Sequence, residues 1–372
     1  ASQNPDRGAT LALKAAGRKA WENGDVTAEA DEEWRGEWRE RSFLGGWGSR
    51  VVEPIEALPD GPRRTISRDF AKAWLEGSSS LPIFTRLPEI ACEVTLAFLI
   101  DWPKRWIRKD DHDISSDRHG FRFLREHFKS AFWTNGPFIG YLRSDWRHGV
   151  ELVIRLTNFA TDCYEEWCPY SPGVESMTIH TSEREVVWKG NEQVFAWNYP
   201  HMNTSEVVTC ALMALEKWFD ERVEAGESVS EAIGLLFRDG RSLALAGVLI
   251  SVGKRHDELF AADLKPLLFL RKLYHLDLFA IRQNVGIGSW PLEGEFVFNA
   301  KREWGNLPGR KEWLRDVCKK WMLTKPEFSE VFLAVSDAWK LEAGSLPEGS
   351  QARKDVERWA VEFNPRLWKK IV

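Results

Sequence analysis

The sequence predicts a mainly α-helical protein, built as an irregular, α-solenoid-like helical array with a small antiparallel β insertion near residues 174–198. Two observations support the helices. Apolar residues recur every three or four positions along most of the chain, which is typical of helices with one buried face. Between residues 203 and 284, helix starts at Asn and Ser and stops at Gly follow one another with short loops. The period changes to two only near residues 174–198, which predicts strands there.

We divide the chain into four segments by composition and pattern. Residues 1–82 form an irregular or helical N-terminal segment, and residues 83–147 form a second helical segment. Residues 148–290 hold the central helical array with its β insertion, and residues 291–372 form a C-terminal helical segment.

The second segment is expected to contain a buried helix over 87–108, interrupted at Pro103, and a further helix over 121–133. An amphipathic helix follows over 148–167. Its stripe of buried positions is Leu152, Leu156, Phe159, Cys163 and Trp167.

Apolar and polar residues alternate around Met177 and Ile179, and again around Val186 and Trp188, which predicts two strands. We place a turn at 189–191 and a continuation of the β insertion over 194–197. The array then resumes with a helix that begins at Asn203, has an apolar stripe from Val208 to Val223 and stops at Gly226; a shorter helix follows that stops at Gly240.

A helix that begins near Ser242 is apolar nearly all round and rich in Ala, Gly and Ser, so neighbours must surround it. Two further helices are expected over 264–270 and 273–282. In the last segment, helical stripes precede a flexible connection over 341–350 and a final helix over 356–363.

The composition excludes several classes of protein. Hydrophobic residues make up 43% and charged residues 29% of 372 residues, and the net charge is −5, so neither disorder nor a general nucleic-acid surface is indicated. The five cysteines lack paired short spacings, which indicates small buried side chains in a reducing, cytoplasmic compartment. The apolar run over 243–252 is too short to span a bilayer.

Twenty tryptophans recur at intervals of three or four with aliphatic companions, which favours packing between helices over stacking on sugars or bases. The glycine-rich stretches at 45–48 and 286–288 lack the Lys-Ser or Lys-Thr of a phosphate-binding loop. No nucleophile elbow and no cofactor motif is recognisable, so we assign no catalytic residue and no cofactor.

A polar cluster offers one alternative with chemistry of its own. Carboxylates and imidazoles at His112, Asp113, Asp117 and His119 are residue types that bind divalent metals, which would suit a hydrolase or nuclease. All four lie in one polar stretch, whereas metal ligands usually come from several separated elements, so a solvated loop is the competing interpretation.

A second alternative is a nucleic-acid-binding module. The basic residues Lys104, Arg105, Arg108 and Lys109 interleave with Trp106, as in a nucleic-acid contact, but acidic residues follow at once and indicate a neutralised surface.

Two histidines could act as general bases. His201 precedes a helix start, and the competing interpretation is a histidine packed in a loop. His256 follows the small-residue helix, and the competing interpretation is a cap at the C-terminus of that helix. The adjacent pair Glu165 and Glu166 points in directions about 100° apart on a helix, which predicts a surface position.

Three stretches, 211–218, 242–254 and 259–260, resemble the helical regions of very large bacterial ATP-binding proteins of the STAND-like type associated with phage defence. The resemblance covers residues 149–284. It implies that this chain is an accessory helical portion of such an assembly, because the ATPase motif is absent here, and it carries over no catalytic residue.

The sequence thus favours a non-catalytic helical scaffold or sensor segment that binds another protein or another part of a larger assembly. The metal-dependent hydrolase and the nucleic-acid-binding module remain the alternatives.

Overall fold

The computed structural model describes residues 73–77, 79–100, 121, 128, 131–167, 173–199, 204–284 and 295–368. These residues are mostly helical and contain one two-stranded antiparallel sheet, which confirms the mainly α class and the β insertion. A solenoid-like stacking of the helices stays a prediction. Within the described residues, no helix has the length and apolar character needed to cross a membrane.

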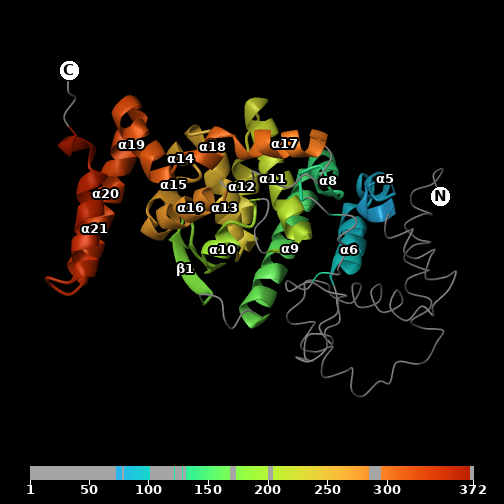
Figure 1. Ribbon diagram of the computed structural model, residues 1–372, viewed down its shortest axis with the longest axis horizontal. Coiled ribbons are helices and arrows are strands. Elements are labelled where there is room, and N and C mark those ends of the chain that lie inside the picture. The colour runs from blue at the N-terminus through green and yellow to red at the C-terminus, as the bar shows by residue number, and fades with distance from the viewer. Residues whose placement is uncertain are drawn as a thin grey trace, which may run out of the picture.

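The body is elongated, and the chain runs along its long axis from α5 and α6 at one end to α20 and α21 at the other (Figure 1). The first half comprises α5 (Leu81–Phe84), α6 (Pro88–Leu99), α8 (Phe138–Ser144), α9 (Trp146–Trp167), β1 (Glu175–His180), β2 (Glu185–Gly190), α10 (Glu192–Phe195) and α11 (Glu206–Glu224). The second half comprises α12 (Ser230–Asp239), α13 (Leu243–Gly253), α14 (Glu258–Ala261), α15 (Lys265–Leu268), α16 (Arg271–Asn284), α17 (Glu295–Gly305), α18 (Pro308–Lys311), α19 (Leu314–Thr324), α20 (Glu327–Ser345), α21 (Gln351–Glu362) and the 3₁₀ turn η2 (Pro365–Leu367).

Helix α9 forms as its amphipathic stripe predicts, and Leu152, Leu156, Phe159 and Cys163 are all buried. It contacts α6, α8, α11 and α12, so its apolar face lies along the core of the first half.

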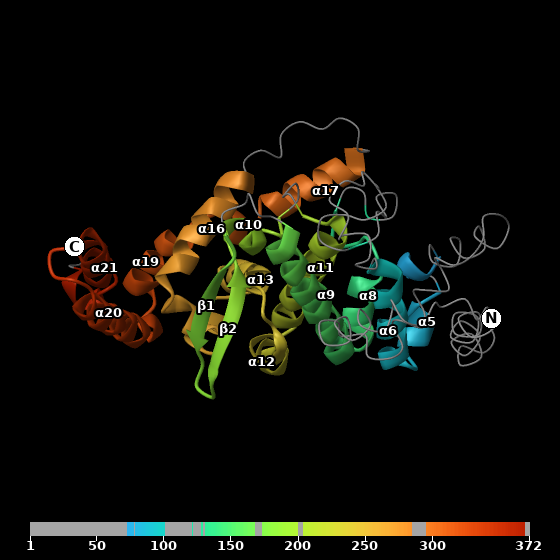
Figure 2. The ribbon, with the colours of Figure 1, turned by 90° about the horizontal axis from the view of Figure 1, so that it is seen from below.

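Helix α13 is buried along its whole length at the centre of the body (Figure 2). The helix begins near Ser242, as the sequence predicts, and the Ser242 hydroxyl caps its N-terminus by accepting a hydrogen bond from the Ala244 N–H at 3.2 Å. Its small residues permit close approach of neighbours. A Cβ on Gly247 would meet the Phe195 carbonyl oxygen at 2.1 Å.

The β insertion differs from the prediction in its turn and in its third part. The hairpin turns at 181–184, where the Thr181 N–H donates to the Arg184 carbonyl oxygen at 3.0 Å. Residues after Gly190 form helix α10 instead of more strand, because Asn191 Oδ1 accepts from the N–H groups of Gln193 and Val194 at 3.1 and 3.0 Å. This side-chain cap starts a helical turn where alternation alone indicates a strand.

Helix α6 ends at Leu99, well before residue 108, and residues 101–120 lie outside the described part of the chain. The predicted helix over 121–133 is contradicted at both of its ends. Phe121 forms an isolated antiparallel bridge with Ile100, and 131–133 are not helical. Phe121 pairs with Ile100 as in a β-sheet, and the helical spacing of apolar residues does not reveal this pairing.

Helix α17 interrupts the progression of elements along the long axis. It lies back beside α11 in both views (Figures 1 and 2), and Trp304 packs with Phe132 and Met213 in a small apolar cluster. The chain therefore covers α11 with a segment about ninety residues later in sequence before it continues to the C-terminal helices.

The C-terminal helices α20 and α21 pair along their lengths (Figure 2). Helix α20 continues to Ser345, so the first half of the predicted flexible connection over 341–350 is helical. Trp339, Trp359 and Phe363 form an aromatic cluster with Tyr274 of α16. This cluster confirms that tryptophans at helical spacing pack between helices.

The four cysteines within the described residues, Cys92, Cys163, Cys210 and Cys318, are free and buried. This confirms their interpretation as small buried side chains.

A Gly247→Ala substitution is expected to lower the free energy of unfolding by about 1–3 kcal/mol, because the added methyl group must displace the Phe195 backbone. Gly234 of α12 is the matched control, since a Cβ there meets nothing within 4 Å, and Gly234→Ala should stabilise by about 0.5–1 kcal/mol. Chemical denaturation measures both. Equal effects of the two substitutions would contradict the close approach at Gly247.

A second prediction concerns acid stability at Glu362, which joins α21 to Arg315 and Lys319 of α19. Burial raises the pKa of Glu362, but hydrogen bonds from Arg315 and Lys319 oppose it and leave the pKa below its ordinary value of 4.5. The folded chain therefore binds this proton less readily than the unfolded chain. The stabilisation is present above pH 4.5 and is lost as the pH falls through the lowered pKa.

Glu362→Gln should flatten the loss of unfolding free energy below pH 4.5, measured by denaturation across an acid pH series. Glu357→Gln on the exposed side of the same helix should keep the wild-type slope. An unchanged slope in Glu362→Gln would show that this carboxylate does not titrate with folding.

Candidate functional site

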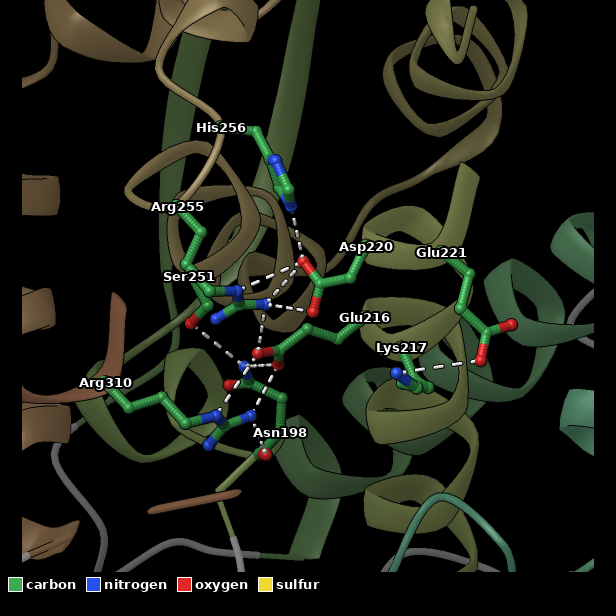
Figure 3. Close-up of polar contacts among 9 residues, drawn as sticks. All are labelled: Asn198, Glu216, Lys217, Asp220, Glu221, Ser251, Arg255, His256 and Arg310. Atoms are coloured by element: carbon green, nitrogen blue, oxygen red, sulfur yellow. Dashed lines mark hydrogen bonds and ion pairs between the residues drawn. The ribbon is translucent and has the colours of Figure 1, made fainter. Parts of the chain in front are cut away.

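A buried network of charged side chains lies in the middle of the body (Figure 3). Helix α11 provides Glu216 and Asp220, which share one face because they are four residues apart. The end of α13 and the residues after it provide Arg255 and His256, and α18 provides Arg310. Two segments distant in sequence therefore converge on α11.

Glu216 is the centre of the network and is fully buried. Arg310 donates to it through Nε at 3.2 Å and Nη2 at 2.5 Å. Arg255 Nη2 donates at 3.0 Å, and Asn198 Nδ2 donates at 2.9 Å. One carboxylate thus accepts from two guanidinium groups and one amide, which compensates for its removal from water.

Arg310 is also fully buried, and its guanidinium lies over two aromatic rings. Its Cζ is 4.4 Å from the ring centroid of Tyr199 and 5.1 Å from that of Trp304. Its Nη2 donates to the Asn198 carbonyl oxygen at 2.9 Å. Arginine suits this position because its planar cation both stacks on aromatic rings and forms paired hydrogen bonds with a carboxylate.

Asp220 lies one turn along α11 and accepts hydrogen bonds from Nε and Nη2 of Arg255. The distance from Arg255 Nη2 to Asp220 Oδ2 is 2.8 Å, and His256 Nε2 is 3.0 Å from Asp220 Oδ1. Burial acts to lower the pKa of Arg255, but Glu216 and Asp220 overcome it and raise the pKa. The His256 ring thus contacts a carboxylate on α11, in addition to its position just after the end of α13.

A separate buried pair lies beside the network. Lys254 Nζ is 2.5 Å from Asp277 Oδ1 and 3.1 Å from the Glu312 carbonyl oxygen, while Asp277 Oδ2 accepts from the Leu314 N–H at 2.7 Å. Burial lowers the pKa of Lys254 and raises that of Asp277, and their mutual contact opposes both shifts. This pair fixes α13 to α16 and to the start of α19.

The network has the properties of a structural clamp. Its carboxylates are already occupied by bases of the same chain, and Glu216 and Arg310 are inaccessible to a substrate. A Cβ on Gly309 would meet the Ser251 carbonyl oxygen at 2.5 Å, so α18 approaches α13 as closely as backbone allows. The chemistry of the network is therefore to hold α11, α13 and α18 together.

A surface groove of about 880 Å³ is the accessible feature that we consider for binding. It lies between the hairpin tip at 180–184, α12 and the stretch 262–269 that contains α15. Its apolar lining comes from Ile233, Leu235, Phe237, Ala262, Pro266 and Phe269.

The groove also carries four basic and three acidic side chains, namely Arg147, Arg184, Arg238, Lys265, Glu183, Glu231 and Asp263. Arg147 pairs with Glu231 at 2.9 Å, and Asp263 accepts from the Ser230 hydroxyl at 2.6 Å. Arg184 and Lys265 are exposed, and neither forms an ion pair with another residue of the described ranges. Two cations in the groove are therefore free to meet a ligand.

The structure does not reach the candidate sites that the sequence indicates. The metal candidates His112, Asp113, Asp117 and His119 lie outside the described residues, as do the basic residues Lys104, Arg105, Arg108 and Lys109, and His201. Among the residues that are described, no group of three or more His, Cys, Asp and Glu side chains could hold a metal ion. The surface position predicted for Glu165 and Glu166 is confirmed, since both are exposed.

Sequence reasoning missed the clamp. The available signal was the presence of Glu216 and Asp220 at an interval of four inside a helix whose other faces are apolar. Such a pair in a buried helix indicates that bases come from elsewhere in the fold.

No protein-family model matches the sequence, and a search of curated proteins found no match. Any proposed function for the chain therefore rests on its residues and their geometry.

The clamp predicts a large difference between two neighbouring carboxylates of α11. Glu216→Gln should lower the free energy of unfolding by roughly 3–5 kcal/mol, because it leaves the buried Arg310 guanidinium without a charged partner and removes one of the two carboxylates that pair with Arg255. Glu221→Gln breaks only the solvent-accessible pairs with Arg143 and Lys217 and should cost about 0.2–1 kcal/mol. Equilibrium denaturation compares the two, and similar losses would refute the clamp.

Proposed function

We propose that the chain is a helical scaffold or sensor segment that binds another protein, or another part of a larger assembly, through its surface. The supporting observation is the contrast between its interior and its groove. The charged groups at the centre pair with one another and are closed to ligands, whereas the groove beside the hairpin is open and holds two cations that form no ion pair within the described residues.

The proposal includes the kind of assembly. The resemblance of residues 149–284 to helical regions of STAND-like ATP-binding proteins suggests that the partner carries the ATPase and that the assembly acts in bacterial defence against phage. The partner would then supply the chemistry, and this chain would supply shape and recognition.

Site-specific photo-crosslinking tests the proposal. A photoreactive phenylalanine analogue at Gly234, which lines the groove and has open space around it, should form an adduct with a partner protein in the cells that make this chain. The same analogue at Gly344 of α20 is the matched control, because that helical glycine also has open space but lies outside the groove.

The adduct is then identified by mass spectrometry, and the protein found is purified and mixed with this chain. We expect direct binding and an ATP-binding domain in the partner. Failure to obtain any adduct beyond that of the Gly344 control, or an identified protein that does not bind when purified, would overturn the scaffold proposal.

A further inference from the structure

The hairpin presents one open strand edge. Strands β1 and β2 pair antiparallel, and the N–H of Thr181 closes the hairpin by donating to the Arg184 carbonyl oxygen. From this bond, hydrogen-bonded pairs alternate with non-hydrogen-bonded pairs down the sheet. Ile179 and Met177 therefore use their backbone groups on β2.

The intervening residues Ser176, Thr178 and His180 direct their N–H and C=O groups away from β2. Lys189, the partner of Ser176, verifies this register, because its N–H donates outward to the Arg241 carbonyl oxygen at 2.6 Å on the opposite edge. The outward backbone groups of β1 have no hydrogen-bond partner among the described residues. The backbone groups of these three alternate residues form a template with which another strand can pair.

The open edge leads into the groove. His180 at the end of β1 lines the groove, and α15, which also lines it, contacts β1. A strand added beside β1 would direct every second side chain toward the body, on the side of Met177 and Ile179. Those side chains would reach the apolar surface that Pro266 and Phe269 contribute.

Resting on the proposed scaffold function, we infer that the partner segment is an extended peptide that adds a strand to the outer edge of β1. Its inward apolar side chains occupy the groove, and a carboxylate meets Arg184 or Lys265. Main-chain hydrogen bonds to Ser176, Thr178 and His180 provide the affinity, while the groove provides the selection among sequences.

A second copy of this chain fits the edge less well than a peptide does. Pairing of two β1 edges covers three alternate residues on each side and leaves the groove empty, which is little area compared with the roughly 1,200 Å² or more that stable interfaces bury. A peptide can both pair with the edge and enter the groove of about 880 Å³.

The experiment uses a display library of short random peptides, selected on the purified chain. Enriched sequences should alternate apolar residues with others and contain Asp or Glu. The best peptide, labelled with fluorescein, is then titrated by fluorescence anisotropy against the chain and its variants.

Thr178→Pro is the decisive variant. It removes an outward N–H and obstructs a neighbouring strand, yet it breaks no bond within the hairpin, as edge positions tolerate proline. The Kd should rise at least about tenfold. Val187→Pro, at the same level on the opposite edge, is the matched control and should keep the wild-type Kd, because its N–H also points away from its partner strand.

Charge variants test the stated chemistry. Arg184→Ala and Lys265→Ala together should raise the Kd by about threefold and reduce its dependence on salt, whereas Glu183→Ala should not weaken binding. Circular dichroism and thermal melting are used to check that each variant folds.

Equal binding to the chain and to Thr178→Pro, or a library that yields no enriched peptide, would overturn the inference. A concentration-dependent dimer that Thr178→Pro abolishes would assign the edge to a second copy and also overturn it. If the partner crosslinked at Gly234 binds Thr178→Pro as well as it binds the wild-type chain, that result would contradict strand addition and would not contradict the scaffold function.

Discussion

The fold depends on the burial of a single carboxylate. Glu216 is removed from water at the centre of α11, and its charge is tolerable only if Arg255 and Arg310 both reach it. That requirement determines where α18 must lie, and it explains why Gly309 approaches the backbone of α13. The return of α17 across α11 places Trp304 against the guanidinium of Arg310 and completes the surroundings of that group.

Local patterns predicted those elements that local interactions determine. The stripe of α9, the Ser242 cap of α13 and the alternation of β1 and β2 were all readable, because each depends on neighbours within a few residues. The residues after Gly190 were misassigned, because burial of Val194 and Phe195 looks the same in a strand and in a capped helical turn. The Asn191 side chain decides between them.

The clamp could not be predicted in the same way, since its partners are distant. Arg310 is 94 residues from Glu216, and no periodicity in either segment pairs them. The groove was equally hidden, because the hairpin tip, α12 and α15 meet only in the folded chain. The metal and nucleic-acid candidates remain predictions, as their residues lie outside the part of the chain that the structure describes.

Interior and surface have different roles in this molecule. In the interior, charged side chains pair with one another and hold the helices in a rigid body. The hairpin is attached to this body through Trp188, which stacks on Phe237 of α12. The surface holds a strand edge and two cations, Arg184 and Lys265, that have no partner among the described residues and can bind another molecule. A recognition element on a rigid support needs little reordering when it binds.

The distance between Glu216 and Arg310 along the chain also imposes an order on folding during synthesis. Helix α11 leaves the ribosome long before α18 does, so in the interval Arg255 is the only guanidinium of the clamp that Glu216 can meet. Glu216 then has only one of its two guanidinium partners, and the face that α17 and α18 later cover is still open to solvent and to chaperones. The pace of translation through the segment between them sets how long the chain spends in that vulnerable state.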